Sequence, residues 1–305
     1  AWRLSISPSV TKVYAIPGSA AMSDCAELVG IDWQQRDHLI SFLKENQVDL
    51  VVVGPEAPLV AGLADVLNKA GIPVFGPSKA AAQLEGSKVF AKDLMKKYNI
   101  PTAAYGVFHK VDEAKAFIAQ TGAPIVVKAD GLAAGKGVVV AMTVGEANAA
   151  VEDMLSGNRF GDAGSTVVIE EFMEGEEASL LAFVDGKTVV PMIASQDHKR
   201  IFDGDKGPNT GGMGTYAPVP VLTDALRDEA MKTILEPMVA AMEKEGMTYV
   251  GCLYAGLMIT DEGPKVVEFN ARFGDPETQV VLPLLDSDLG QIMMACATGT
   301  LTADM

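Results

Sequence analysis

The stretch Pro124-Ile-Val-Val-Lys128-Ala-Asp-Gly131-Leu-Ala-Ala-Gly135-Lys136-Gly137-Val-Val-Val-Ala141 carries more structural information than any other part of the chain. Two β-branched runs flank a glycine-rich loop with a lysine at each end, which predicts a strand–loop–strand unit. Glycine has no Cβ, so such a loop lets backbone amides approach a polyphosphate, and the lysines add charge for phosphate oxygens. A Walker loop would run into a helix, whereas residues 138–141 are typical of a strand. The segment predicts either a nucleotide-binding hairpin or an ordinary glycine-rich hairpin with solvated lysines.

Composition indicates a globular protein of two or three domains. The chain has 305 residues, is 49% hydrophobic and 21% charged, and carries a formal net charge of −16. Nucleic-acid binding needs clustered cations, so this acidic balance argues against it, whereas a small phosphorylated molecule needs only a few local cations. The three cysteines lie far apart, which disfavours a disulfide framework or a zinc site and predicts a reducing compartment. We expect no membrane partner and a cytoplasmic location, or a plastid if a transit peptide preceded Ala1.

The order of apolar patterns predicts an α/β protein with three regions. Residues 1–86 alternate short strands with short helices, which indicates a doubly wound parallel sheet. Residues 107–173 run strand, helix, glycine loop, helix and strand, which predicts a small α+β lid. Residues 87–106 and 174–305 alternate strands with longer helices and predict a central domain.

The second informative block is Lys265-Val-Val-Glu268-Phe-Asn270-Ala-Arg272-Phe-Gly-Asp275-Pro-Glu277. Glu268, Asn270 and Arg272 alternate with apolar residues, so on a strand they would share one face. A carboxylate and an amide oxygen suit a hard cation such as Mg²⁺, and an arginine beside them could clamp a phosphoryl group. The alternative is an amphipathic strand whose polar face lies in water.

Two other segments join polar residues to loop-type sequence. Residues 170–177, Glu-Glu-Phe-Met-Glu-Gly-Glu-Glu, follow a strand of the buried type. Main-chain groups there can contact an adenine edge, although acidic turns are also commonly solvated. Residues 196–200 and 207–214 form a long non-regular region, and loops of this length are often functional. The glycine amides at 210–214 could hold an anion, whereas His198 is open between a structural and an acid–base role.

These blocks, in this order, resemble the ATP-grasp superfamily and, within it, the phosphoribosylamine–glycine ligases (glycinamide ribonucleotide synthetases) of purine biosynthesis. The resemblance spans essentially the whole chain. Its motifs are Val53-Gly-Pro-Glu-Ala-Pro-Leu-Val60, Ala82-Gln-Leu-Glu-Gly-Ser-Lys88, Val127-Lys-Ala-Asp-Gly-Leu-Ala-Ala-Gly-Lys-Gly-Val138, Gln196-Asp-His-Lys-Arg200, Pro208-Asn-Thr-Gly-Gly-Met-Gly214 and Glu268-Phe-Asn-Ala-Arg-Phe-Gly-Asp-Pro-Glu277.

The resemblance implies an ATP-grasp fold with a pre-ATP-grasp domain at 1–86, a central ATP-grasp domain at 87–106 plus 174–305, and a lid at 107–173. By the same comparison, the family's first strand and its C-terminal domain of about a hundred residues are expected to be absent from this sequence.

The implied activity is ATP-dependent carbon–nitrogen ligation. Glycine would be joined to 5-phosphoribosylamine, giving glycinamide ribonucleotide, ADP and phosphate through a glycyl phosphate intermediate. ATP and Mg²⁺ or Mn²⁺ would be the cofactors, and fusion to or association with other purine-pathway enzymes is left open. Two alternatives remain: a truncated ATP-binding fragment without turnover, and another ATP-grasp ligase or a carboxylase that uses bicarbonate.

The family pattern also implies a role for each motif residue. The implied ATP-binding residues are Lys88, Lys128, Gly131, Gly135, Lys136, Gly137, Glu170, Glu171, Phe172 and Glu177. The implied metal ligands are Glu268 and Asn270. The residues implied to lie near glycine and phosphoribosylamine are Asp197, Lys199, Thr210, Gly211, Gly212, Met213 and Gly214. Arg272, at the reacting phosphoryl group, would be catalytic together with Lys128 and Asp275.

Overall fold

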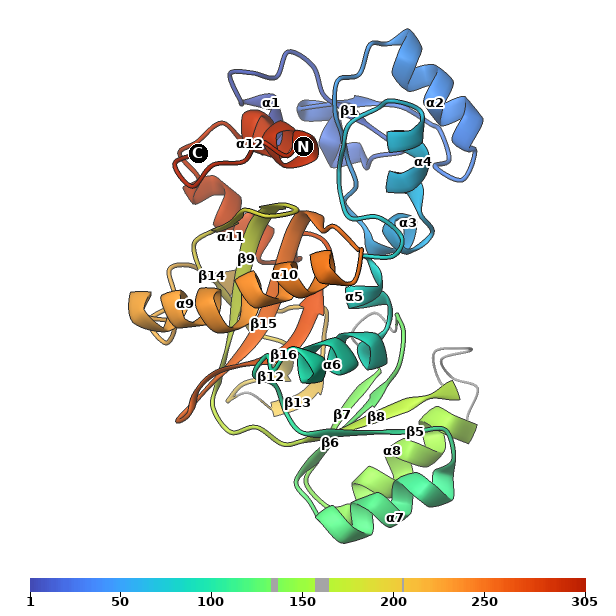
Figure 1. The fold of residues 1–305 in the computed structure, drawn as a ribbon, viewed down its shortest axis with the longest axis vertical. Helices are drawn as coiled ribbons and strands as arrows, with labels where there is room; N and C mark the ends of the chain where they lie inside the picture. Colours follow the sequence, from blue (N-terminus) through green and yellow to red (C-terminus); the bar gives the residue numbers. More distant parts are fainter. Residues whose placement is uncertain (133–136, 157–164, 205) are drawn as a thin grey trace.

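The computed structural model describes residues 1–132, 137–156, 165–204 and 206–305. Three regions follow one another along the long axis of the molecule (Figure 1). The N-terminal α/β region lies at one end, the lid sheet with its two helices lies at the other, and a second sheet lies between them. The mixed α/β architecture agrees with the predicted ATP-grasp fold.

The N-terminal region contains two separate pairs of parallel strands. The strands are β1 (Tyr14–Ala15), β2 (Glu27–Leu28), β3 (Val51–Val52) and β4 (Val74–Phe75). β1 pairs with β2, and β3 pairs with β4. The helices are α1 (Trp2–Ser5), α2 (Arg36–Glu45), α3 (Glu56–Val60), α4 (Leu63–Lys69), α5 (Gln83–Gly86) and the 3₁₀ helix η1 (Ala20–Asp24). Gly62, with φ of +84°, divides the helical pattern of residues 59–70 into α3 and α4, because glycine adopts the left-handed conformation without a Cβ clash.

The lid sheet has the order β5-β8-β6-β7, and every neighbouring pair in it is antiparallel. Its strands are β5 (Tyr105–Phe108), β6 (Ile125–Ala129), β7 (Val138–Ala141) and β8 (Val167–Glu171). The helices α7 (Val111–Thr121) and α8 (Val144–Ser156) bury their apolar faces against it. The strand–loop–strand prediction is confirmed, because β6 and β7 pair directly across the glycine-rich loop.

The central sheet has the order β10-β9-β15-β16 and is also antiparallel. Its strands are β9 (Glu176–Asp185), β10 (Val189–Pro191), β15 (Val250–Thr260) and β16 (Gly263–Asn270). Alternate residues of β9 enter two different cores: Leu180 and Ala182 lie in one, and Leu181 and Phe183 in the other. Helices therefore cover both faces of this sheet, which explains why β9 is almost continuously apolar.

Helices around the central sheet complete the fold. They are α6 (Lys88–Lys97), α9 (Asp224–Ala230), the π-helix η3 (Met231–Leu235), α10 (Glu236–Lys244), α11 (Thr278–Val281), the 3₁₀ helix η4 (Leu282–Leu284) and α12 (Leu289–Thr298). Among the described residues no single helix is long and apolar enough to cross a membrane. Only residues 278–284 and 289–298 pass that test together, as a pair bent by 103°.

The region at 196–216 differs from the non-regular loop expected from the sequence. Gln196–Asp197 (β11) pairs antiparallel with Thr215–Tyr216 (β14), and Arg200–Phe202 (β12) pairs antiparallel with Lys206–Asn209 (β13). We call residues 196–216 the substrate loop, after the role that the family resemblance implies for it. Its strands are two to four residues long, which is too short to produce a recognisable alternation of apolar and polar residues.

Candidate nucleotide and substrate site

A buried ionic cluster joins the lid sheet to helix α6. We call Lys92, Lys128 and Glu170 the buried cluster. Oε2 of Glu170 lies 2.9 Å from Nζ of Lys92 and 2.9 Å from Nζ of Lys128. The three residues are only 2%, 4% and 2% exposed. Among the buried side-chain atoms of the described residues, Oε1 of Glu170 is one that has no hydrogen-bond partner.

The pairing of β6 with β8 explains why two members of this cluster meet. Glu170 lies opposite Val126 in that pair. Lys128 is two residues further along β6, so its side chain projects from the same face as that of Val126 and lies diagonal to Glu170. Lys128 also donates to the carbonyl oxygen of Val267 in the central sheet at 3.0 Å.

Lys92 is a member of the site that sequence reasoning missed. It lies four residues after Lys88 on α6, so both lysines project from one side of the helix. Burial lowers the pKa of Lys92 to about 8, even though Glu170 favours its charged form. Lysines are rarely buried without a partner, and the partner here, Glu170, lies 78 residues away on strand β8. The only local indication that Lys92 belongs to the site was its helical spacing from Lys88 and from the buried Met95.

Helix α6 also anchors the beginning of the glycine-rich loop. Nζ of Lys88 donates to the carbonyl oxygen of Gly131 at 2.8 Å. Asp130 accepts from the backbone N–H of Val89 at 3.2 Å and from the hydroxyl of Ser87. Gly131 has φ of +81°, a conformation that favours glycine.

The rest of this loop is described only at its far end. The backbone N–H of Ala129 donates to the carbonyl oxygen of Gly137 at 2.8 Å, which closes the hairpin. Gly135 and Lys136, which the sequence placed in the ATP site, lie outside the described residues.

The end of β8 carries the predicted adenine-side residues. The backbone N–H of Glu171 donates to the carbonyl oxygen of Ala104 at 2.8 Å, and its Oε2 accepts from the N–H of Ala104 at 3.2 Å. Phe172 follows directly and is half-buried. Glu171 is therefore tied to the segment that leads into β5, while Glu170 points into the buried cluster.

Glu268 and Asn270 lie at the end of β16. A β-bulge at Val267 shifts the register, so that Gly256 faces Glu268 and Leu257 faces Val266. Burial alone would raise the pKa of Glu268, but Lys199, Lys128 and Lys88 outweigh it and lower the pKa. The carboxylate is therefore ionised and surrounded by cations from the substrate loop, the lid sheet and α6.

The donor set on β16 fits Mg²⁺. Mg²⁺ is usually held by one or two protein carboxylates together with substrate phosphates and water, rather than by a cage of side chains. Within the described parts of the chain, no group of three or more His, Cys, Asp or Glu residues could hold a metal ion. The side-chain amide of Asn270 donates to the ionised Glu268, and this carboxylate–amide pair is consistent with a metal site that a bound phosphate completes.

Arg272 lies beyond the strand and contacts the N-terminal region. The expected alternation holds as far as Asn270, where β16 ends. Nη2 of Arg272 lies 2.8 Å from Glu85 and Nε lies 3.4 Å from Glu56. The polar face predicted for a single strand is thus divided, because the chain turns after Asn270 and Arg272 pairs with carboxylates of α5 and α3.

The substrate loop carries a second lysine–carboxylate group. We call Lys199, Glu177 and Asp197 the loop cluster. Nζ of Lys199 lies 3.1 Å from Glu177 and 3.9 Å from Asp197. Burial raises the pKa of Asp197, while the surrounding carboxylates, Glu177 and Glu268 first among them, raise the pKa of Lys199 against the effect of burial.

The glycine-rich part of the substrate loop packs against the same residues. Thr210 donates from both its backbone N–H and its hydroxyl to the carbonyl oxygen of Lys199, at 2.7 and 2.8 Å. The hydroxyl of Thr210 accepts from the N–H of Gly212 at 3.1 Å. Gly212 has φ of +133°, and a Cβ there would lie 2.5 Å from Cδ of Pro276. The close approach explains the glycine at this position.

The remaining predicted residues of this loop lie near His198. The N–H of Met213 donates to the carbonyl oxygen of His198 at 2.7 Å, and the N–H of His198 donates to that of Gly214 at 2.9 Å. The His198 ring stacks on Tyr216, with 5.9 Å between centroids. Gly211, between Thr210 and Gly212, has open space around it. The contacts of His198 are those of a residue that supports the loop.

The Gly-Asp-Pro-Glu turn presents two acidic residues in different environments. Asp275, expected to be catalytic, is exposed and accepts from Nε2 of Gln279 at 2.6 Å. Glu277 is buried and accepts from the hydroxyl of Tyr254 at 2.8 Å, which in turn lies 2.9 Å from the hydroxyl of Ser179. No role was predicted for Glu277, and its partners on β9 and β15 could not be inferred from local sequence.

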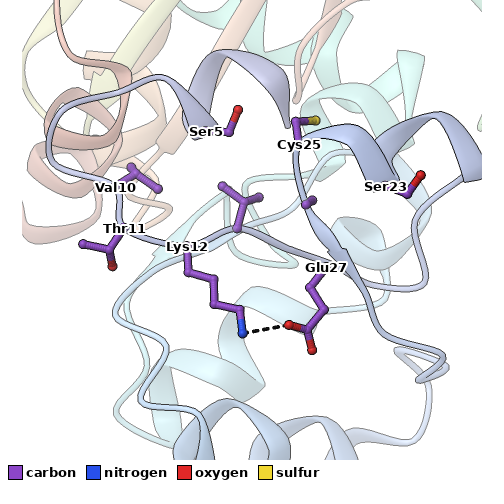
Figure 2. A pocket seen from close by; sticks show the side chains of 9 residues that line it. Ser5, Val10, Thr11, Lys12, Ser23, Cys25 and Glu27 are labelled. Atoms are coloured by element: carbon purple, nitrogen blue, oxygen red, sulfur yellow. Dashed lines mark ion pairs between the residues drawn. The ribbon is translucent and has the colours of Figure 1, made fainter.

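A cavity of about 400 Å³ lies in the N-terminal region, apart from these groups (Figure 2). Its lining residues all fall between positions 5 and 27. Lys12 and Glu27 form an exposed ion pair of 2.7 Å beside it. None of the predicted site residues that the structure describes belongs to its lining.

Comparison with known proteins identifies the family. Residues 1–85 match the N domain of phosphoribosylglycinamide synthetase, and residues 86–278 match its ATP-grasp (A) domain. A phosphoribosylamine–glycine ligase from Halalkalibacterium halodurans is 57% identical over 299 residues, covering 98% of this chain and 70% of that protein. The chain belongs to the phosphoribosylamine–glycine ligase family. A family member from Vibrio cholerae is 53% identical over 304 residues, covering 71% of its length.

Solved structures agree with this assignment to the phosphoribosylamine–glycine ligases. The enzyme of that name from Thermotoga maritima superposes with a TM-score of 0.85 at 33% identity, covering 98% of this chain and 72% of its own. The biotin carboxylase domain of Hydrogenobacter thermophilus 2-oxoglutarate carboxylase has a TM-score of 0.72 at 18% identity, covering 94% and 64%. That second likeness establishes the shared ATP-grasp fold alone.

Proposed function

We propose that this chain catalyses the ATP-dependent ligation of glycine to 5-phosphoribosylamine, giving glycinamide ribonucleotide, ADP and phosphate. The observation that carries the proposal is the convergence of cations on one ionised carboxylate. Glu268 is influenced by Lys88 from α6, Lys128 from the lid sheet and Lys199 from the substrate loop. A phosphoryl transfer between ATP and a small acid needs nucleotide, metal and acceptor at one such point. Membership of the ligase family supports this reading.

The first step uses the carboxylate of glycine as the nucleophile on the γ-phosphorus of ATP. That carboxylate is already ionised at neutral pH, so no general base is required. We assign Lys88 and Lys128 to the phosphates and Arg272 to the reacting phosphoryl group. Glu268 and Asn270 would hold Mg²⁺ or Mn²⁺, which supplies charge neutralisation at phosphate oxygens. Catalysis then rests on positioning and on fixed positive charge.

In the second step, the amine of phosphoribosylamine attacks the acyl carbon and phosphate leaves. We assign Asp197, Lys199 and residues 210–214 to the two acceptor substrates, with Asp275 near them. The acyl phosphate hydrolyses in water, so closure of the glycine-rich hairpin over the site is a mechanistic need. The unpartnered Oε1 of Glu170 is an acceptor that suits an amino group of adenine, in keeping with the place given to Glu170, Glu171 and Phe172. The cytoplasmic location and any association with other purine enzymes stay predictions.

The test is product formation by this 305-residue chain. ATP, Mg²⁺, glycine and phosphoribosylamine generated in place are mixed with the protein, and glycinamide ribonucleotide is measured by mass spectrometry. We expect product from the unmodified chain and a loss of at least about a thousandfold in Glu268→Ala, since a charged partner of the transferring phosphoryl is removed. Glu262→Ala is the matched control. Glu262 is an exposed carboxylate just before β16, and it pairs with Lys265 of that strand.

Two results would contradict the proposal. ATP binding without product would indicate a nucleotide-binding fragment. ATP hydrolysis that depends on bicarbonate and not on glycine would indicate a carboxylase.

A further inference from the structure

We propose that Lys92 is a positioning residue for the triphosphate of ATP, acting through Glu170 to leave the charge of Lys128 available to phosphate. The inference rests on the proposed function in that it takes ATP as the ligand. It adds a residue to which the family pattern in the sequence assigned no role.

The first argument is the way the two lysines share one acceptor. Nζ of Lys92 and Nζ of Lys128 both lie 2.9 Å from the same oxygen, Oε2 of Glu170. Two ammonium groups therefore face one carboxylate, and the buried cluster carries one uncompensated positive charge. Without Lys92, Lys128 and Glu170 would form a neutral one-to-one pair. A phosphate approaching Lys128 would then meet an adjacent carboxylate whose charge Lys92 no longer balances.

The second argument is that the buried cluster is anchored to β16, the strand that carries the proposed metal ligands. Nζ of Lys92 donates to the hydroxyl of Thr102 at 2.8 Å, which donates to the carbonyl oxygen of Val266 at 2.7 Å. Nζ of Lys128 donates to the next carbonyl along, that of Val267. Both lysines are thus fixed to successive residues of β16, immediately before Glu268. Lys92 ties α6 and the lid strand β8 to the strand that carries the proposed metal ligands.

The third argument is that the fold itself gains little from this charge. Burial lowers the pKa of Lys92, so the folded protein favours the neutral amine more than water does. A lysine kept for stability alone would have its charge stabilised by its surroundings. A buried charge held at a cost is typical of binding and catalytic sites.

The experiment compares nucleotides that differ in their number of phosphates. Binding of Mg²⁺·AMP-PNP and of AMP to the full chain is measured by isothermal titration calorimetry, with no turnover required. In Lys92→Met we expect the affinity for AMP-PNP to fall about tenfold or more, and that for AMP to change less than about threefold. Lys96→Met is the matched control, because Lys96 is exposed on the same helix one turn further on. It should leave both affinities unchanged.

A double variant separates charge balance from simple loss of packing. In Lys92→Met with Glu170→Gln, the cluster again carries one net positive charge, as in the unmodified chain, and Gln keeps an oxygen acceptor for the adenine amino group. AMP-PNP affinity should therefore recover towards that of the unmodified chain, relative to the AMP affinity of the same variant. Lys92→Arg, which keeps the cation, should retain tight binding. If Lys92→Met does not fold, Lys92→Gln replaces it, since the amide can still donate to Thr102.

Two results would overturn the inference: an equal loss of affinity for AMP and AMP-PNP, or a double variant no better than the single one. Absence of ligase turnover with the binding pattern intact would contradict the proposed function and leave this inference standing.

Discussion

The buried cluster and the Lys199–Glu177 pair of the loop cluster contain the same chemistry in opposite environments. In the first, Glu170 lies 2.9 Å from each of two lysines, and the side chains are at most 5% exposed. In the second, Lys199 lies 3.1 Å from Glu177, with side chains 31% and 45% exposed. The distances are nearly equal, but of these pairs water reaches only the one between Lys199 and Glu177. The comparison separates what ion-pair geometry does from what desolvation does.

The difference suits the two kinds of ligand that we propose for this site. Water cannot solvate a buried charge when its partner moves away. A buried cluster therefore keeps one arrangement, and breaking it is costly. Exposed pairs contribute little and exchange partners readily. A buried cluster of fixed geometry suits a nucleotide that binds in the same way in every turnover. Substrates that enter and leave through the loop are suited by the second, because Lys199 can release Glu177 to a ligand at small cost.

The largest expected effect is on folding stability. Glu170→Gln leaves two buried ammonium groups without a carboxylate and should lower the free energy of unfolding by about 3–5 kcal/mol. Glu177→Gln removes the equivalent partner from the loop cluster and should cost less than about 1 kcal/mol. Urea denaturation of both variants, followed by circular dichroism, measures the difference. Similar losses in the two variants would show that burial does not distinguish the clusters.

A second test concerns the backbone that shapes the loop cluster. Gly212→Ala places a Cβ 2.5 Å from Pro276 at φ of +133°, whereas Gly211 has no atom within 4 Å of the corresponding position. Strain of about 1–3 kcal/mol at Gly212 should displace the loop and raise KM for glycine or phosphoribosylamine by about tenfold. KM for ATP should stay within about twofold.

Gly145→Ala is the control for that substitution and should behave as the unmodified chain, because Gly145 lies in α8, outside the predicted site, and a Cβ there would meet only Oγ1 of Thr143 at 3.9 Å. Steady-state kinetics with each substrate varied in turn gives the result. An equal rise in KM for ATP would mean that the substrate loop and the buried cluster are not independent.

The sequence predicted the elements whose information is local. The β6–β7 hairpin and β16 follow from β-branched runs and alternation. The acidic and basic residues of both clusters, except Lys92, lie in motifs that were recognised from their residue types. Pairing of β6 with β8 then brings Lys128 to Glu170 without further information.

Partners from distant segments were not predictable in the same way. Whether Lys92 is buried depends on Glu170. Whether Arg272 faces β16 or the N-terminal region depends on Glu85 and Glu56. The short strands β11 and β14 exist because Gln196 pairs with Tyr216 and Asp197 with Thr215, across a separation of 18 to 20 residues. Each of these features is set by tertiary contacts that leave no periodic trace in a window of ten or so residues.

The smallest expected effect is a pH dependence confined to the buried cluster. Lys92 has a pKa of about 8 in the folded chain, below its usual 10.5. It is faced by Glu170 and Lys128, by Glu171, and by the ring of Tyr105 at 5.8 Å. As the pH rises through 8, Lys92 loses its charge, so Lys128 is neutralised by Glu170 and KM for ATP should rise.

Folding stability should rise over the same window, opposite to the fall in nucleotide affinity. Between pH 8 and 10.5 the unfolded chain binds more protons at Lys92 than the folded chain does, so raising the pH there favours folding through this group. Lys92→Arg stays protonated and should lose both trends relative to the unmodified chain. Two results would mean that Lys92 stabilises the fold and does not tune the charge offered to phosphate. One is nucleotide affinity and folding stability that change in the same direction with pH. The other is a Lys92→Arg variant that keeps the alkaline rise in KM for ATP. The loop cluster, whose lysine has its pKa raised, supplies no such dependence between pH 8 and 10.5, which makes this window specific to one of the two clusters.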